Sequence, residues 1–559
     1  MPTVSAHVAS TLARHIDHVF GVMGNGNAYF LDAVERDTPA TYTAVRHEAG
    51  GVAAADAFHR ASGRLAAATA TYGAGFTNAL TPLAESAQAR IPLVLVVGDA
   101  PTTGPRAWDV DQIALAAAVG VRTYTVGATD AATTTVAAIE HAVNDRVPVI
   151  LAIPYDVAAL DAGPVPDAGT PRMSPPPAPD DEVARAAIRD IATALRDAEH
   201  PLLLAGRGAW VSRAGSALGA LADATGAITA TSSLARSIFP RSEYDLGVTG
   251  GFGAEGAMTL IHRADVVVVF GASLNQFTMR FGDLFAPSTR VFQVDVASAA
   301  THPRVTGFVR GDAAIVAREI SAELDRLAAA PSGWREAVDI APLRRYDDGD
   351  GMAPDGRLDP RSVAQRIAEM LPEDRVVVSD GGHFIGWANM YWPVASPDRM
   401  MMVGTAFQTI GLGWPSLPGA ALAQPDATVV LTTGDGGALM ALADLDSAVR
   451  VAGGRGMAVI WNDAAYGAEV NLYGLKGLAR DPMLIPQVDF ATLAAGVGAE
   501  GVVVERLEDL DRLSSWARTP VQDRPFLVLD CRISGDVIAP YQREIIHVNG
   551  IALPEPATT

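Results

Sequence analysis

The sequence predicts an α/β protein built from three doubly wound parallel-sheet domains. Its length of 559 residues is enough for about three or four domains of roughly 150 residues each. Short apolar segments alternate with helical patterns along most of the chain, as in parallel sheets that helices cover on both faces. Two segments, 158–180 and 328–356, interrupt this alternation and separate three such units.

The first unit, residues 1–157, begins with an amphipathic helix pattern over its first twenty residues. Four later apolar segments are expected to be strands of a parallel sheet, namely 42–45, 65–71, 92–99 and 148–154. The next segment, 158–180, contains seven prolines and almost no periodic apolar pattern. It is therefore predicted to be a linker.

The second unit, residues 181–327, has the same alternation. Its expected strands are 201–206, 227–232, 264–271 and 290–295. The turns Gly206-Arg207-Gly208 and Gly271-Ala272-Ser273 follow two of these strands and could bind a nucleotide, although short glycine turns occur in any α/β domain. Residues 328–356 are predicted to be a second linker.

The third unit, residues 357–533, contains expected strands at 375–382, 429–431, 457–461 and 525–531, with a helix from about 439 to 451. The tail, residues 534–559, carries Tyr541, Arg543 and His547 and ends in a polar stretch with prolines. It could cover an active site, but a disordered terminus is the default expectation for such a segment.

The stretch Val429–Gly467 contains the most informative local pattern. A strand, helix and strand crossover makes its two strands parallel, so Asp435 and the pair Asn462-Asp463 both follow carboxyl ends of strands. If the strands are neighbours, they lie about 5 Å apart, and oxygen ligands from both loops can reach one Mg²⁺. The glycines of this turn let backbone amides approach a phosphate at the start of a helix; they are Gly434, Gly436 and Gly437. The pattern predicts a magnesium-diphosphate site.

Composition excludes several classes of function. The net charge of −21 argues against a nucleic-acid partner, and no apolar run reaches the roughly 18 residues of a membrane span. The N-terminus lacks the apolar region of a signal peptide, and the one cysteine, Cys531, excludes an intramolecular disulfide. We therefore expect a cytoplasmic protein. Lys476 is the only lysine, so no other position can form a lysine Schiff base.

A second group of polar residues lies in the first unit. Arg46-His47-Glu48 follows an expected strand and precedes a helix of small residues. The loop 24–27 and the turn 71–75 also lie between strands and helices. Each feature alone is ordinary, because acidic residues favour the first turn of a helix and glycines favour turns. Their combination is less ordinary.

These motifs together resemble the thiamine-diphosphate-dependent family of acetolactate synthase, pyruvate decarboxylase and benzoylformate decarboxylase. The resemblance rests on RHE before a small-residue helix, TYGAGFTNAL, IPLVLVVGDAP, AGRGA in the middle unit, and GDG followed about a helix later by Asn-Asp. It extends from residue 1 to about 533. The family's domain order implies a pyrimidine-binding domain, a central Rossmann-like domain and a diphosphate-binding and magnesium-binding domain.

The resemblance assigns roles to individual residues. Glu48 matches the glutamate that hydrogen-bonds the aminopyrimidine and promotes loss of the thiazolium C2 proton. Ile410 matches the apolar residue that holds the cofactor bent, and the Gln408 carbonyl would accept the cofactor's amino group. Gly382 and His383 match the loop that touches the diphosphate. Two further residues are placed in the cofactor site, Thr71 and Tyr466.

The resemblance also implies a set of metal ligands. Asp435 matches the first ligand, and the backbone carbonyl of Ala465 would be a third oxygen. The family's second ligand is the second residue of an Asn-Asn pair, where this chain has Asp463 after Asn462. Aspartate is a suitable magnesium ligand but adds charge, so either Asn462 or Asp463 could coordinate.

The substrate is less well defined by the sequence. The candidate pocket residues are Asn25, His47, Gln112, His383 and Glu469, each of which could instead be a structural polar group. The paired histidines of pyruvate decarboxylases are absent from 106–116, where Gln112 matches a glutamine of the acetolactate synthases. The default reaction is therefore decarboxylation or carboligation of a 2-keto acid.

Two alternatives stay open at this point. The first is a lyase or decarboxylase that acts on a 2-hydroxyacyl or oxalyl thioester of coenzyme A, with Arg280 as a phosphate contact. The second is a non-catalytic protein that only binds the cofactor. The central domain could also hold FAD or ADP. Active sites of the family form between subunits, which implies a homodimer or homotetramer.

Overall fold

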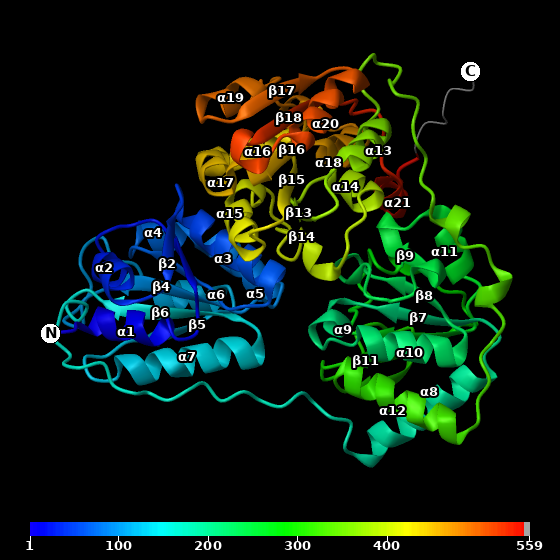
Figure 1. Cartoon of the computed structure of the whole chain (residues 1–559), viewed down its shortest axis with the longest axis horizontal. Helices are drawn as coiled ribbons and strands as arrows, with labels where there is room; N and C mark the ends of the chain where they lie inside the picture. The colour runs from blue at the N-terminus through cyan, green and yellow to red at the C-terminus, as the bar shows by residue number, and fades with distance from the viewer. Residues whose placement is uncertain (553–559) are drawn as a thin grey trace.

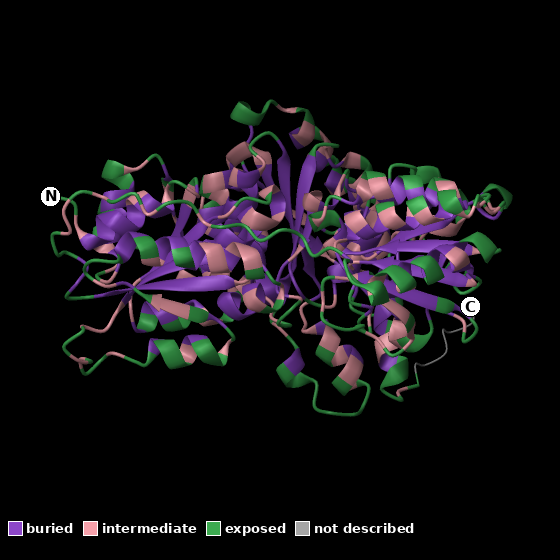
Figure 2. Cartoon of the chain, turned by 90° about the horizontal axis from the view of Figure 1, so that it is seen from below, coloured by how far each residue is buried: buried purple, intermediate pink, exposed green. Residues whose placement is uncertain are grey.

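The computed structural model describes residues 1–552 and contains three six-stranded sheets, in which every strand is parallel to its neighbours (Figure 1). Helices cover the sheets, and the buried residues lie mainly on the strands and on the inner faces of the helices (Figure 2). The predicted fold class is confirmed. In the described residues, no helix is long and apolar enough to cross a membrane.

The first sheet has the order β2-β1-β3-β4-β6-β5. Its strands are β1 (His18–Gly21), β2 (Thr41–Ala44), β3 (Ala67–Ala70), β4 (Leu93–Asp99), β5 (Arg122–Thr125) and β6 (Pro148–Pro154). Its helices are α1 (Val4–Leu12), α2 (Ala28–Asp37), α3 (Glu48–Ser62), α4 (Ala74–Asn78), α5 (Leu80–Gln88), α6 (Gln112–Ala118) and α7 (Ala131–Asp145).

Sequence patterns missed two strands of this sheet. The helix pattern expected over the first twenty residues is wrong beyond Leu12, because His18–Gly21 forms strand β1, which lies between β2 and β3 in the sheet. Edge strand β5 is only partly buried, so it lacks a continuous apolar run.

The second sheet has the order β12-β11-β10-β7-β8-β9. Its strands are β7 (Pro201–Ala205), β8 (Ile228–Thr231), β9 (Asp245–Val248), β10 (Val266–Phe270), β11 (Arg290–Asp295) and β12 (Val305–Arg310). Its helices are α8 (Glu182–Asp197), α9 (Arg207–Val211), α10 (Gly215–Thr225), α11 (Glu255–Ile261) and α12 (Ala313–Arg326). The two strands that the sequence did not indicate, β9 and β12, are the edge strands.

The third sheet has the order β14-β13-β15-β16-β18-β17. Its strands are β13 (Arg375–Ser379), β14 (Met400–Met402), β15 (Thr428–Gly434), β16 (Gly456–Asn462), β17 (Glu500–Val504) and β18 (Leu527–Arg532). Its helices are α13 (Pro360–Met370), α14 (Ile385–Tyr391), α15 (Gly413–Ala423), α16 (Asp435–Met440), α17 (Leu445–Ala452), α18 (Gly467–Glu469), α19 (Phe490–Gly496) and α20 (Asp511–Arg518). The single helix expected at 439–451 is wrong, since a break near Ala441 separates α16 from α17.

The first and third units pack directly against each other through α3 and α15 (Figure 1). One hydrophobic core includes Phe58 of α3 together with Trp414 and Leu417 of α15. At Gly419 a Cβ would lie 1.8 Å from the carbonyl oxygen of Ala54, so only glycine permits this close approach of the two helices.

The C-terminal tail forms helix α21 (Pro540–Val548), so the expected disordered terminus is wrong for this part of the tail. Tyr541 is buried against Phe252 and Phe277, with ring centroids 5.3 and 5.9 Å away. Glu544 accepts a hydrogen bond of 2.6 Å from Arg280. Helix α21 of the tail thus packs against the central unit and is hydrogen-bonded to it. The end of the tail, from residue 553 onward, lies outside the described residues.

Candidate active site

The carboxyl ends of β15 and β16 lie side by side in the third sheet. The two strands are parallel neighbours, and Gly434 pairs in register with Trp461. Asp435 is therefore the first residue of α16, and Asp463 follows the last residue of β16. The crossover thus places two acidic residues at the carboxyl edge of the sheet. This is the edge at which open α/β sheets bind their ligands.

Both carboxylates are buried and lack partners for several oxygen atoms. Asp435 is 3% exposed, and its Oδ1 accepts a hydrogen bond of 2.9 Å from the Gly436 amide. Its Oδ2 and both carboxylate oxygens of Asp463 have no hydrogen-bond partner among residues 1–552. Burial, followed by the neighbouring Asp463 carboxylate, raises the pKa of Asp435 to about 7. Buried carboxylate oxygens without partners suit a divalent cation.

Asn462 has a different environment from Asp463, although the two are adjacent in sequence. Its side-chain amide donates hydrogen bonds to Asp530 Oδ1 at 2.8 Å and to the Val488 carbonyl at 3.1 Å. The side chain is fully buried among these partners. Asn462 therefore links β16 to β18, and its donors are already used.

His383 lies next to the two carboxylates. Its Nε2 is 2.8 Å from Asp463 Oδ2, which is an ion-pair distance, although the atoms do not align as a hydrogen bond. Burial disfavours a charged imidazole, but the Asp463 carboxylate outweighs burial and raises the pKa of His383. The hydroxyl of Tyr541 donates to the His383 carbonyl. Helix α21 therefore reaches the loop that precedes α14.

Glycines leave room at the start of α16. A Cβ at Gly436 would lie 2.7 Å from a ring carbon of Tyr466, so a larger residue would displace this ring. The neighbouring positions Gly434 and Gly437 are also buried. Ala465 forms an isolated bridge with Leu484, and Glu469 is exposed on α18. Apart from Asp435, the residues around the start of the helix are glycines, which leave its amides open to approach by an anion.

Asp380 organises the loops around this edge, and the sequence analysis did not identify it. Its carboxylate accepts hydrogen bonds from the amides of Gly381 at 2.8 Å, Gly411 at 3.2 Å and Leu412 at 3.2 Å. It also accepts a bond of 3.1 Å from the Thr433 hydroxyl. Burial raises the pKa of Asp380 to about 6. One buried carboxylate thus joins the ends of β13 and β15 to the loop before α15.

The loop before α15 carries Gln408 and Ile410. Gln408 is exposed and has a φ of 57°, so its peptide groups are turned relative to an extended chain. Ile410 is half-buried, and its Cγ2 lies 3.3 Å from the position of a Cβ at Gly381. The Gly382 turn, with a φ of 133°, is adjacent to this loop through Gly381. The loop therefore lies over the carboxyl edge of the third sheet.

The first unit contains a second group of candidate residues at the carboxyl edge of its own sheet. Glu48 is the first residue of α3, and its Oε2 accepts a hydrogen bond of 3.0 Å from the Asn78 amide. The Thr71 hydroxyl accepts a bond of 2.8 Å from the Gly26 amide. Asn25 is exposed and donates to the Tyr72 hydroxyl at 2.9 Å. The structure brings these loops together around Glu48.

Two candidate substrate residues of the first unit have structural roles in this chain. His47 precedes α3, and its Nδ1 accepts the Ala49 amide at 3.2 Å, which is a helix cap. Gln112 is 5% exposed. It accepts the Gly73 amide at 2.7 Å and donates to the Gly98 carbonyl at 2.9 Å. Both side chains already have partners within the first unit.

The partners of Glu48 and Asp435 come from different units of the chain. Glu48 contacts first-unit residues, whereas Asp435 faces Asp463 and His383 of the third unit. The amino end of α3 does contact the third unit, but through Arg46, whose amide donates to Asp444 at 3.0 Å. The two groups of site residues are therefore separate clusters in a single chain.

The glycine turns of the central unit pack against each other. The Gly206 amide donates to the Phe270 carbonyl at 2.8 Å, and the Gly208 amide donates to the Gly271 carbonyl at 2.9 Å. These two amides are therefore not free to bind a phosphate in this structure. Arg280 pairs with Glu544 and lies 3.1 Å from Glu255, so its charge is balanced by carboxylates.

The geometry defines a three-unit α/β protein with two buried carboxylates, Asp435 and Asp463, at one sheet edge and a glutamate at the edge of another sheet. Comparison with known proteins gives the same order of units. Residues 2–115 match the N-terminal TPP binding domain of thiamine pyrophosphate enzymes. Residues 188–320 match the central domain, and residues 380–530 match the C-terminal TPP binding domain. The chain belongs to the thiamine pyrophosphate enzyme family, and it is a thiamine-diphosphate-dependent enzyme.

Similar proteins align over nearly the whole chain. A sulfoacetaldehyde acetyltransferase from Castellaniella defragrans is 27% identical over 606 residues, covering 98% of this chain and 95% of that protein. An acetolactate synthase from Mycobacterium bovis is 28% identical over 545 residues, covering 93% and 86%. An acetolactate synthase large subunit from Parasynechococcus marenigrum is 28% identical over 530 residues, covering 91% and 84%. The chain is thus related to both kinds of enzyme.

Proposed function

We propose that Asp435, Asp463 and the Ala465 carbonyl hold a Mg²⁺ ion that binds the diphosphate of the cofactor. The observation that carries this proposal is the set of buried carboxylate oxygens of Asp435 and Asp463 that lack hydrogen-bond partners in the described residues. No group of three His, Cys, Asp or Glu side chains in residues 1–552 is arranged to hold a metal. Two carboxylates therefore need further oxygens, and diphosphate and backbone carbonyl oxygens have the required chemistry.

The other residues of this edge then have supporting roles. The glycine turn at the start of α16 gives phosphate oxygens access to backbone amides. His383 next to Asp463 offsets the additional negative charge of the aspartate at this position. Asn462 is assigned to the structure of the sheet, since its amide donates to Asp530 and Val488. Ile410 and Gln408 lie on the loop that would contact the middle of the cofactor.

Glu48 is proposed to hydrogen-bond the aminopyrimidine and to hold the proton exchanged during cofactor activation. When bound, thiamine diphosphate supplies a carbon nucleophile that attacks a substrate carbonyl and stabilises the charge left when the adjacent C–C bond breaks. The residues of the chain position the two ends of the cofactor: Glu48 the pyrimidine, and Asp435 and Asp463 the diphosphate.

We further propose that the complete site forms between two copies of the chain in a homodimer or homotetramer. Glu48 and Asp435 belong to separate clusters within one chain, which supports this arrangement. Large apolar side chains are also exposed near the edges of both sheets. They include Met23 at 63%, Trp108 at 64%, Ile113 at 53% and Met440 at 58% exposure. A second copy would remove these side chains from water.

The substrate class we favour is a 2-keto acid, in a decarboxylation or carboligation of the acetolactate-synthase type. Relatives named acetolactate synthase support it. Acetyl transfer involving sulfoacetaldehyde is a second candidate, because a relative with that name aligns with 98% of this chain. The acyl-CoA alternative has less support, because Arg280 is paired with Glu544 and the Gly206 and Gly208 amides are already bonded.

The variant Glu48→Gln tests the role of Glu48. Glutamine keeps the side-chain size but cannot accept or hold the proton as a carboxylate does. We expect thiamine diphosphate to bind in isothermal titration calorimetry, while exchange of its C2 proton in deuterium oxide, followed by NMR, falls to near the rate in free solution. Glu508→Gln, an exposed change in the third unit away from the site, is the matched control. Normal exchange in Glu48→Gln would exclude the proposed role.

A substrate panel separates the reactions. Pyruvate, benzoylformate, branched keto acids, glyoxylate, sulfoacetaldehyde with phosphate, and acyl-CoA thioesters should be supplied to the enzyme with thiamine diphosphate and Mg²⁺. Release of carbon dioxide with carboligation products supports the 2-keto acid reaction. Formation of acetyl phosphate from sulfoacetaldehyde and phosphate, with cleavage of the C–S bond and release of sulfite, supports acetyl transfer. Turnover of acyl-CoA alone would overturn both proposals.

A further inference from the structure

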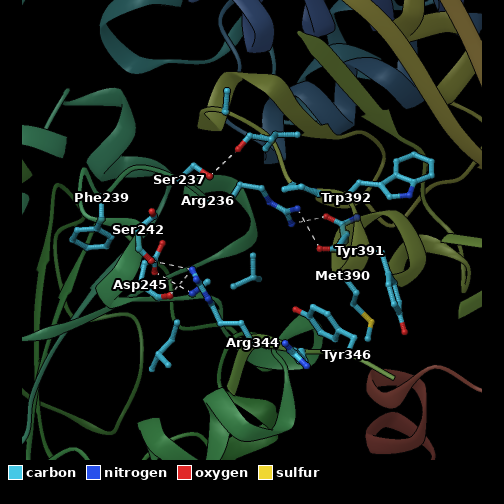
Figure 3. Close-up of a pocket in the computed structure, with 18 of the residues that line it drawn as sticks. Arg236, Ser237, Phe239, Ser242, Asp245, Arg344, Tyr346, Met390, Tyr391 and Trp392 are labelled. Carbon is cyan, nitrogen blue, oxygen red and sulfur yellow. Dashed lines mark hydrogen bonds between the residues drawn. The ribbon is translucent and has the colours of Figure 1, made fainter. Parts of the chain in front are cut away.

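A large pocket lies between the central unit and the third unit, beside the edge strand β9 (Figure 3). Its volume is about 920 Å³, near the upper end of the size usual for small-molecule sites. One side is formed by the loop after β8 and by β9, and the other by the end of α14 and the segment that follows it. None of the residues assigned above to the cofactor site lines this pocket.

Three arginines line the pocket: Arg236, Arg344 and Arg345. None of them forms an ion pair with a carboxylate in residues 1–552, whereas arginines elsewhere in the chain commonly do, as Arg361 does with Asp359. Two acidic residues, Asp245 and Asp348, also line the pocket. The arginines therefore outnumber the carboxylates here, in a protein whose net charge is −21.

Arg236 is the most informative of these residues because it is only 7% exposed. Its guanidinium donates to the Ser233 carbonyl at 3.1 Å and to the backbone and side-chain oxygens of Asn389 at 3.2 and 3.0 Å. All three acceptors are neutral. A guanidinium has five N–H donors, so two are not used by these bonds. Burial lowers the pKa of Arg236 to about 10, so it stays charged at neutral pH. Buried charges are normally compensated by a charge of opposite sign.

The other walls offer contacts of a different kind. Arg344 donates from Nη1 to the carbonyls of Ser242 at 3.0 Å and Asp245 at 3.1 Å, so it also has neutral partners. Figure 3 shows Tyr346, Met390 and Tyr391 facing the same space. The Oε1 atom of Gln365 is buried at this pocket without a hydrogen-bond partner in the described residues. The pocket therefore combines positive charge, an apolar wall and an unused acceptor.

We infer that this pocket binds a small organic anion whose phosphate or carboxylate group is held by Arg236 and Arg344. The planar guanidinium groups match the paired oxygens of such anions, and the ligand's apolar part would lie against Tyr346 and Met390. Arg236 itself connects the central unit to α14, the helix that follows the His383 loop, through its hydrogen bonds to Asn389. This inference does not depend on the reaction proposed above.

Isothermal titration calorimetry of the full chain tests the inference. The protein is first saturated with thiamine diphosphate and Mg²⁺, so that the cofactor site cannot bind the probe. Inorganic phosphate, glycerol 3-phosphate and succinate are then titrated separately. We expect saturable binding of at least one of them. Binding of either phosphate compound would show that the pocket takes a phosphate group, and binding of succinate would show that it takes a carboxylate. The same binding is expected without the cofactor.

Substitutions of the arginines that line the pocket test whether the measured binding takes place there. Arg344→Gln and Arg345→Gln should weaken binding, Arg344→Gln by roughly tenfold or more because it removes a charge-assisted contact. Arg518→Gln, an exposed change on α20, is the matched control and should have no effect. Arg236→Lys keeps the charge but not the fork geometry, and should weaken binding without unfolding the protein. Absence of binding for all three probes, or equal loss in Arg518→Gln, would overturn the inference.

Discussion

The contrast between Asp463 and Asn462 gives the sharpest prediction about the metal site. The two residues are adjacent, yet Asp463 has two carboxylate oxygens without hydrogen-bond partners in the described residues, while Asn462 has both donors in use. Asp463→Ala should therefore weaken Mg²⁺ binding, and Asn462→Ala should affect the fold. Asp463→Asn keeps the shape and one oxygen, so its effect should be intermediate.

The sizes of the two effects follow from these contacts. Loss of a residue that only hydrogen-bonds a metal ligand costs about 10-fold to 100-fold in metal affinity. Loss of a carboxylate that binds the metal directly should therefore raise the required Mg²⁺ concentration by at least about 100-fold. Asn462→Ala removes two hydrogen bonds, one of them to the Asp530 carboxylate. Asp530 keeps the Phe490 amide at 3.0 Å and Arg532 at 2.7 Å. The expected loss is about 1 to 3 kcal/mol in the free energy of unfolding.

The assay is titration of Mg²⁺ at a fixed concentration of thiamine diphosphate, with cofactor binding followed by tryptophan fluorescence. Urea unfolding without cofactor measures the stability of each variant. We expect Asp463→Ala to shift the Mg²⁺ midpoint strongly and Asn462→Ala to shift mainly the unfolding midpoint. A larger Mg²⁺ shift in Asn462→Ala would refute the assignment and make Asn462 the ligand.

Two further predictions concern stability. Burial raises the pKa of Asp380 to about 6, so its carboxyl group binds a proton more tightly in the folded state than in the unfolded state. Protonation therefore stabilises the folded state at low pH, and this contribution to the free energy of unfolding is lost as the pH rises from about 4 to about 6. Measured by urea unfolding, the free energy of unfolding of the wild type should thus fall by up to about 3 kcal/mol over this interval relative to that of Asp380→Asn. A difference between the two proteins that does not change with pH would contradict this prediction. Gly419→Ala forces a Cβ to within 1.8 Å of the Ala54 carbonyl and should cost about 1 to 3 kcal/mol. Gly496→Ala has open space around its Cβ and is the control; equal melting temperatures for the two variants would contradict the prediction.

Much of the fold could be predicted from apolar patterns. The predicted strands at 92–99, 148–154 and 290–295 lie within about a residue of β4, β6 and β11. Buried strands of parallel sheets are continuous apolar runs, and those are visible in a sequence. Among the missed strands, β5, β9, β12, β14 and β17 are edge strands of their sheets, where burial is partial or the strand is short.

The motifs predicted which residue types form the site, but not which of these side chains are free of hydrogen bonds to the rest of the chain and can bind a metal. The sequence placed Asp435, Asn462 and Asp463 at strand ends, because a right-handed crossover puts those loops on one edge. It did not distinguish the two neighbours at 462 and 463. Their difference depends on Asp530 and Val488, which are 68 and 26 residues away from Asn462.

The sequence by itself determined the fold class, the order of the three units and the family, since apolar periodicity and short motifs are local properties of the chain. Only the tertiary structure decided that Gln112 is occupied by backbone partners, that Asp380 joins three segments, and that the tail forms a helix on the central unit. The arginines at 236 and 344 likewise acquire a shared pocket only when the central and third units pack. Hydrogen bonds and charge pairing between distant segments depend on that packing, which local patterns do not encode.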